Sequence, residues 1–242
     1  HLKEMLRTGM YEFNARPYMG YTLSALLTLH AFAESDELVH LTQKILDHVN
    51  YTYAMSSMDY RRSVPFRRRL ARVKNTDIFN DPHSAMMKAW VKKFKGEAVK
   101  PSDIDYGKHQ ALMTLLLRYQ LPEKVAELAE NNTGEYLLRI GHGHKASPEI
   151  HSRGAGFLLS AGGVQRGKTS QIVARPTVLI LDDGVMDYQN CFYLTGKGKM
   201  KKWNNTGVYH RFACAERPVY IPEQYSPALE QGSWKIFKPY SN

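Results

Sequence analysis

The stretch GFLLSAGGVQRGKTSQIVARPTVLILDD, residues 156–183, decides between two kinds of fold. Its end, TVLILDD, is similar to the acidic strand end that holds magnesium in nucleotide-hydrolysing enzymes. Its middle has the spacing G-x-x-x-x-G-K-[ST], with which P-loop enzymes hold nucleotide phosphates, at Gly162, Gly167, Lys168 and Thr169. The stretch therefore predicts either a nucleotide-binding α/β domain or two strands joined by a glycine-rich connection.

The spacing after the lysine favours the two strands. In a P-loop, a helix begins at the Lys-Thr end, so that its first backbone amides face the phosphates. Here residues 170–175 would form less than two helical turns before Pro176, and a proline ends a helix. A parallel strand would also need a crossover of about a dozen residues or more. We therefore expect the P-loop match to be accidental and the two strands to be antiparallel.

On the C-terminal side, short apolar runs alternate with turn residues. Their lengths and their β-branched or aromatic content predict antiparallel strands. Two of the runs carry Cys191 and Cys214, which can pair or remain buried thiols. The runs are GFLLSA, TVLILDD, NCFYLTG, VYHRFACA, PVYIP and SWKIF.

On the N-terminal side, apolar residues recur at helical spacing. The pattern predicts helices at 21–33, 36–55, 84–94, 106–119 and 122–130. The Gly-, Pro- and Ser-rich stretch GHGHKASPE (141–149) separates the segments with helical spacing from the short strand-like runs. Helices followed by strands predict an α+β protein, with a helical domain at 1–145 and an antiparallel β-sandwich domain at 146–242.

The net positive charge of the chain favours some classes of binding partner over others. The chain has 242 residues, a formal net charge of +10 and 43% hydrophobic residues. A basic surface favours an anionic partner, such as nucleic acid, anionic lipid or a uronate-containing glycan. The chain has no run of ~18 apolar residues, so no membrane-spanning helix is expected.

Polar and aromatic groups are crowded just before the first predicted helix. Aromatic rings stack on sugar faces, while guanidinium and amide groups hold carboxylates and hydroxyls. The mixture therefore predicts a carbohydrate site at the mouth of the helices. The residues are Tyr11, Glu12, Asn14, Arg16, Tyr18 and Tyr21.

Several phrases of the sequence resemble one family. EFNARPYMGYTLSALLTLHAFAESDEL (12–38) resembles the loop and helix of α/α-toroid polysaccharide lyases, the alginate, chondroitin and heparinase type. FLLSAGGV (157–164), RPTVLILDDG (175–184) and NNTGVYHRFACAERPVYIP (204–222) resemble the β-sandwich that follows such a toroid. The resemblance implies helical hairpins of a partial toroid, then a sandwich, with other segments of a longer chain as partners. A secreted or periplasmic location is the corresponding expectation.

The resemblance also implies a reaction, which is β-elimination on an acidic polysaccharide without a cofactor. In that family an amide neutralises the uronate carboxylate, a tyrosine or histidine removes the C5 proton, and a tyrosine protonates the leaving oxygen. Tyr60 and His83 stand at helix ends, where a toroid has its cleft. The catalytic candidates are Asn14, Tyr18, Tyr60 and His83, and the substrate-binding candidates are Arg16, Tyr21, Arg61, Arg62 and Arg67.

Other functions stay open at this point. The arginine-rich stretch 60–72 suits an acidic glycan, and it equally suits the phosphates of a nucleic acid, a less favoured partner. A non-catalytic glycan-binding module needs no intact acid and base. A glycoside hydrolase needs two carboxylates, for which Glu12 with Asp36 or Asp59 are candidates. His142 and His144 are two potential metal ligands without a third, so a linker is favoured over a metal site.

Overall fold

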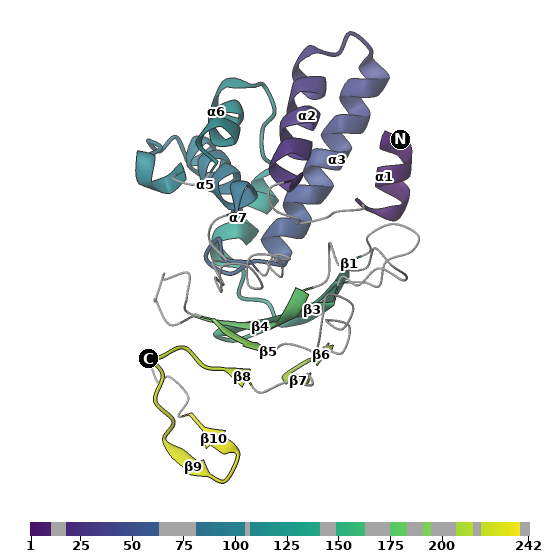
Figure 1. Cartoon of the computed structure of the whole chain (residues 1–242). Helices are drawn as coiled ribbons and strands as arrows, with labels where there is room; N and C mark the ends of the chain where they lie inside the picture. Colours follow the sequence, from purple (N-terminus) through teal and green to yellow (C-terminus); the bar gives the residue numbers. More distant parts are fainter. Residues whose placement is uncertain are drawn as a thin grey trace.

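The computed structural model describes nine stretches of the chain. They are residues 1–10, 18–62, 81–104, 107–140, 149–162, 175–182, 191–194, 207–214 and 219–237. The helices lie in the first half and the strands in the second half, which confirms the α+β class. Figure 1 shows the helices gathered on one side of the main sheet.

Six α-helices and one short 3-10 helix are described in the first half. All five predicted helices are present, with ends shifted by a few residues, whereas the first helix was not predicted. The helices are α1 (Leu2–Thr8), α2 (Tyr18–Phe32), α3 (Asp36–Met55), α5 (Pro82–Lys95), η1 (Pro101–Ile104), α6 (Lys108–Leu116) and α7 (Glu123–Asn131).

Helix α5 has clear start and stop signals. The Asp81 carboxylate accepts a hydrogen bond from the backbone N–H of His83 at 3.1 Å, and Pro82 occupies the first turn. Gly96 ends the helix in the left-handed region, with φ 70°. The helices enclose an apolar core in which Leu27, Leu46 and Trp90 are buried.

The starts of three helices meet at Pro82. A Cβ added to Gly20, in the first turn of α2, would lie 2.9 Å from the Pro82 Cβ. A Cβ added to Gly107, which precedes α6, would lie 3.0 Å from the Pro82 Cα. Only glycine permits this approach, which brings the N-terminal ends of α2, α5 and α6 together.

The main sheet has six antiparallel strands in the order β1-β2-β3-β4-β5-β8. Two further two-stranded ribbons follow, β6 with β7 and β9 with β10. The strands are β1 (Tyr136–Ile140), β2 (Glu149–Gly154), β3 (Phe157–Gly162), β4 (Arg175–Leu181), β5 (Phe192–Leu194), β6 (Gly207–Tyr209), β7 (Phe212–Cys214), β8 (Val219–Tyr220), β9 (Leu229–Gln231) and β10 (Trp234–Ile236).

The pairing of β3 with β4 decides the question raised by the P-loop pattern. The two strands are antiparallel neighbours, with Gly162 opposite Arg175. A P-loop requires a helix after its first strand and a parallel strand beyond it. The expected antiparallel pair is therefore confirmed, while Gly167, Lys168 and Thr169 lie outside the described residues.

The structure bears on four further expectations from the sequence. VYHRFACA, predicted as one strand, is the ribbon β6–β7, because the chain turns at His210, where φ is 50°. Cys191 is buried, Cys214 is exposed, and both are free thiols. The sheet begins with β1, before the boundary predicted at residue 145. Among the described residues, no helix has the length and apolar character needed to cross a membrane.

Alternation along the strands gives the sheet two different faces. On one face, Ile150 and Leu159 pack with Val208 of β6. On the other face, Leu158 and Val178 pack with Met58, which follows α3. Because side chains alternate along a strand, β2 directs Glu149, His151 and Arg153 toward the helices. The Arg153 guanidinium donates to the Ser57 carbonyl at 2.9 Å, which ties this face to the end of α3.

Candidate functional site

A tight turn after α3 begins the candidate site. Met58 and Arg61 exchange two backbone hydrogen bonds of 2.8 Å around Asp59 and Tyr60. Both central residues have positive φ, 49° for Asp59 and 58° for Tyr60. A two-residue hairpin turn of type I′ needs this conformation, which is unfavourable for residues other than glycine. Such strain is retained where the surroundings hold it in place, and it often marks functional sites.

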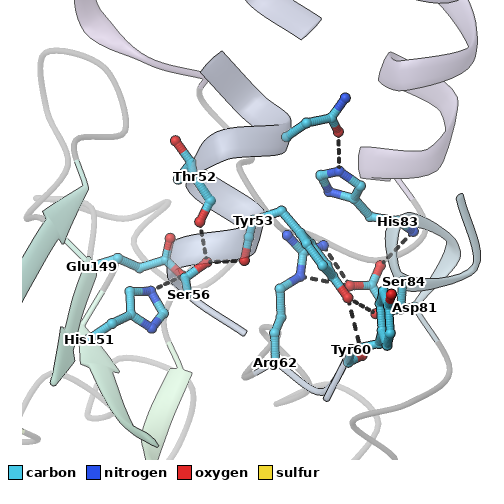
Figure 2. Close-up of polar contacts among 11 residues, drawn as sticks. Thr52, Tyr53, Ser56, Tyr60, Arg62, Asp81, His83, Ser84, Glu149 and His151 are labelled. Atoms are coloured by element: carbon cyan, nitrogen blue, oxygen red, sulfur yellow. Dashed lines mark hydrogen bonds and ion pairs between the residues drawn. The ribbon is translucent and has the colours of Figure 1, made fainter. Parts of the chain in front are cut away.

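The turn buries two consecutive arginines. Arg61 is fully buried, and its guanidinium donates to Asp59 at 2.8 Å and to the Leu181 carbonyl at the end of β4 at 2.7 Å. Arg61 therefore fastens the turn to the sheet. Arg62 points toward the helices instead, where it meets Asp81 and Tyr53 (Figure 2).

The Arg62–Asp81 ion pair is the centre of the site. The Arg62 Nε donates to the Asp81 carboxylate at 2.7 Å, and both side chains are buried. The Arg62 guanidinium carbon lies 4.7 Å from the centre of the Tyr53 ring, a cation–π distance. The Tyr53 hydroxyl lies 2.8 Å from the Ser84 Oγ and 3.1 Å from the Tyr60 carbonyl oxygen. These contacts join α3, the turn and α5.

A second chain of hydrogen bonds fixes the proton position on His83. The Tyr119 hydroxyl donates to the Asp47 carboxylate at 3.0 Å and accepts from the Asn50 amide nitrogen at 3.1 Å. The Asn50 oxygen therefore faces the His83 Nε2, at 2.8 Å. Because an amide oxygen only accepts, Nε2 carries the proton of the neutral ring. Nδ1 is then the basic nitrogen, and it has no hydrogen-bond partner among the described residues.

Burial keeps the two histidines of the site neutral. It lowers the pKa of His83 well below the ordinary value, and the Arg62 charge lowers this pKa further. Burial, again with a contribution from Arg62, lowers the pKa of His151 on β2 to about 3. The Arg62 charge thus lowers the pKa of one histidine on the helices, His83, and of one on the sheet, His151.

The sheet side of the site is a compact polar group. The His151 Nδ1 lies 2.7 Å from the Ser160 Oγ on β3, and its Nε2 lies 3.5 Å from a Glu149 oxygen. All three side chains are completely buried. A serine, a histidine and a carboxylate in contact resemble a nucleophilic triad, and this group is as deeply buried as His83.

Tyr60 is the partly exposed member of the site. Burial raises the pKa of its phenol, and the negative charges of Glu130, Glu97 and Asp103 raise this pKa further. The Lys88 ammonium lies 5.7 Å from the centre of the Tyr60 ring. The phenol therefore keeps its proton at neutral pH and can donate it.

The structure gathers four of the nine predicted site residues. Tyr60, Arg61, Arg62 and His83 lie around the turn and the start of α5. Tyr18 and Tyr21 are exposed on α2, whose first turn contacts Pro82. The other predicted site residues, Asn14, Arg16 and Arg67, lie outside the described residues, as do His142 and His144.

Sequence reasoning missed the partners of these residues. Asn50 and Tyr53 lie in a strongly helical pattern, which gives no sign of a polar role. Asp81 carries a recognisable signal, since Asp-Pro at a helix start predicts a cap. Glu149 and His151 lie in EIHSRG, where polar residues on both sides of the apolar Ile150 could have indicated a strand with a polar face. No group of three potential metal ligands is present in the described part of the chain.

Comparison with protein-family models, with curated proteins and with solved structures finds no match for the chain. Function is therefore inferred from the chemistry of the buried cluster and from the resemblance in the sequence.

The neutral histidines predict a loss of stability in mild acid. An unfolded histidine binds a proton below pH ~6.5, whereas His83 and His151 resist protonation in the folded state. In mild acid the unfolded state then binds more protons than the folded state. The free energy of unfolding therefore decreases as the pH is lowered, by up to about 1.4 kcal/mol per pH unit for each histidine. Denaturant unfolding between pH ~7.5 and ~5 measures this slope, and His151→Gln should remove its own share. A flat profile would contradict the neutral, buried state.

The buried ion pair predicts strong coupling between Arg62 and Asp81. Arg62→Met or Asp81→Asn leaves one buried charge unpaired, and each should destabilise the protein by about 3–5 kcal/mol. Asn keeps the helix cap, so the effect of Asp81→Asn reports the charge. The double variant should lose less than the sum of the two, as measured by denaturant unfolding. Glu130→Gln, at the partly exposed Lys95–Glu130 pair, is the control with little effect, and strict additivity would argue against the pair.

The proton position on His83 predicts a nitrogen NMR signature. In the wild type, the His83 ring should show a protonated Nε2 and an unprotonated Nδ1 at neutral pH. Tyr119→Phe removes the acceptor that orients Asn50, so both tautomers should become populated. Tyr136→Phe, which changes a tyrosine bonded to Asn132 and Met55, is the matched control. A protonated Nδ1 in the wild type would refute the assignment.

Proposed function

We propose that the chain is an acidic-polysaccharide lyase that cleaves a uronate-containing glycan by β-elimination. The observation that carries this proposal is His83, a buried neutral histidine whose Nδ1 is basic and without a partner among the described residues. A base at neutral pH must be unprotonated, and the low pKa of His83 meets this requirement. The +10 net charge and the resemblance of the sequence to toroid lyases support the same substrate class.

The reaction needs three groups, and the chain offers a candidate for each. His83 Nδ1 removes the C5 proton of the uronate, a step that requires the residues covering the buried ring to open. The C5 electrons form the new C4–C5 double bond as the C4–O bond breaks, and the Tyr60 phenol, which keeps its proton at neutral pH, protonates the leaving oxygen. Positive and amide groups neutralise the uronate carboxylate, for which Asn14 and Arg16 are the candidates. Tyr18, Tyr21 and Arg67 are the candidates for binding neighbouring sugars.

A second candidate function is a glycan-binding module without catalysis. The observation that favours it is the complete burial of Arg61, Arg62 and His83. Arg62 already neutralises Asp81, and His83 already bonds Asn50, so these groups also serve the helix–sheet junction. In such a module, only the exposed residues near the start of α2 would contact the sugar.

Ultraviolet absorbance of the unsaturated uronate product tests the proposal directly. The wild-type chain is incubated with alginate, hyaluronan, chondroitin and heparan, and absorbance should rise on one of them. His83→Gln should lower the rate by about 100-fold or more, the usual contribution of a general base. Tyr60→Phe and Asn14→Ala should also lower it strongly, since each removes one of the three groups.

Tyr193→Phe is the control, because Tyr193 stacks on Tyr220 at the far strands of the sheet. It should leave the rate unchanged. A folded chain that forms no product on any of the polymers would refute the lyase, and binding to one of them without product would support the module.

A further inference from the structure

Helix α2 carries no charge on any face. Its fifteen residues, Tyr18–Phe32, contain no Asp, Glu, Lys or Arg. One side of the helix is buried against the rest of the helical layer, through Leu23, Leu26 and Leu27 among others. Because helices on a protein surface normally place charged residues outward, an uncharged outer face indicates a surface that is covered.

The outer face of α2 is a continuous stripe. It consists of Tyr18, Tyr21, Ala25, Leu29 and Phe32, all of which are exposed. The spacing of three or four residues keeps them within one face of the helix. Tyr21 is 58% exposed and Phe32 is 71% exposed, which is high for aromatic side chains.

The threonine and serine hydroxyl groups of α2 do not oppose burial. Thr22, Ser24 and Thr28 donate to the backbone carbonyls four residues earlier, at 3.1, 2.9 and 2.9 Å. Burying a hydroxyl is costly when it loses its hydrogen bond to water. Here the hydroxyls already have acceptors within the helix, so another surface can cover the face without leaving these donors unpaired.

The stripe is symmetric about its middle residue. Counted from Ala25, the large side chains stand at −7, −4, +4 and +7. We propose that α2 docks a second copy of this chain, antiparallel, with a two-fold axis beside Ala25. Tyr21 then packs on the partner's Leu29, and Tyr18 packs on the partner's Phe32. The small side chain of Ala25 lets the two helices approach at the axis, and a two-fold contact needs such a self-complementary surface.

The area of the stripe sets the strength of the dimer. At roughly 200 Å² for each aromatic side chain, the exposed parts of the three aromatic residues and Leu29 offer about 400 Å² per copy. A standard interface buries ~800 Å² per partner, so this interface belongs to the small, weak class. We therefore expect a dimer that forms and dissociates with concentration. Because Tyr18 and Tyr21 are also the candidates for binding sugars in the proposed function, dimer formation and glycan binding should compete for this face of α2.

Sedimentation and light scattering over the micromolar range test the dimer. The wild-type chain should move from one to two chain masses as its concentration rises. Ala25→Arg places two like charges at the axis and should raise the dissociation constant by about 100-fold or more. Ala98→Arg, the same change at an exposed alanine after α5, should leave it unchanged.

A charge exchange tests the antiparallel register. Tyr21→Lys and Leu29→Glu should each weaken the dimer, because each places a charge against an apolar partner. The double variant should recover the dimer, since each introduced lysine then faces the carboxylate introduced in the other copy. A chain that stays monomeric at all concentrations, a dimer insensitive to Ala25→Arg, or a double variant as weak as the single ones would overturn the proposal.

Discussion

The junction between the helices and the sheet depends on the ion pair between Arg62 and Asp81. Two opposite charges in a dry interior are tolerated only when they are close and well oriented. Asp81 meets this requirement because it is held at the start of α5, where it also caps the helix. Arg62 meets it because the turn after α3 directs its side chain inward. The position of α5 relative to α3 is therefore set by charge as well as by apolar packing.

Several features follow from that buried charge. The guanidinium lies against the Tyr53 ring, and its field helps to keep His83 and His151 neutral. The unfavourable conformation of Asp59 and Tyr60 persists because Arg61 and Arg62 are anchored on either side of the junction. Because Asp81 neutralises Arg62, the ion pair adds no net charge to the site, and the neutral His83 remains the candidate base of the proposed chemistry.

The sequence contained much of the fold and little of the site. Residues 36–55 and 82–95 have strong helical periodicity and caps, and both helices lie where they were predicted. The segment VYHRFACA has no glycine or proline, so its turn at His210 left no local signal. Of the candidate site, the sequence singled out Tyr60 and His83 at helix ends, and Arg61 and Arg62 in an arginine-rich stretch. Asn50 and Asp47 look like ordinary helix residues, because their roles depend on Tyr119, which is distant in the sequence and close only in the folded chain.

The two thiols of the chain differ sharply in chemical character. Cys191 packs with Met58 and Leu158 on the helix-facing side of the sheet, where burial raises its pKa to about 12, so almost no reactive thiolate forms at neutral pH. Cys214 is exposed on β7. The folded protein thus offers a single natural attachment point for a thiol-directed dye or cross-linker, on the strand ribbon and away from the helical mouth. Reaction of the second thiol, Cys191, therefore reports the fraction of molecules in which the sheet has opened.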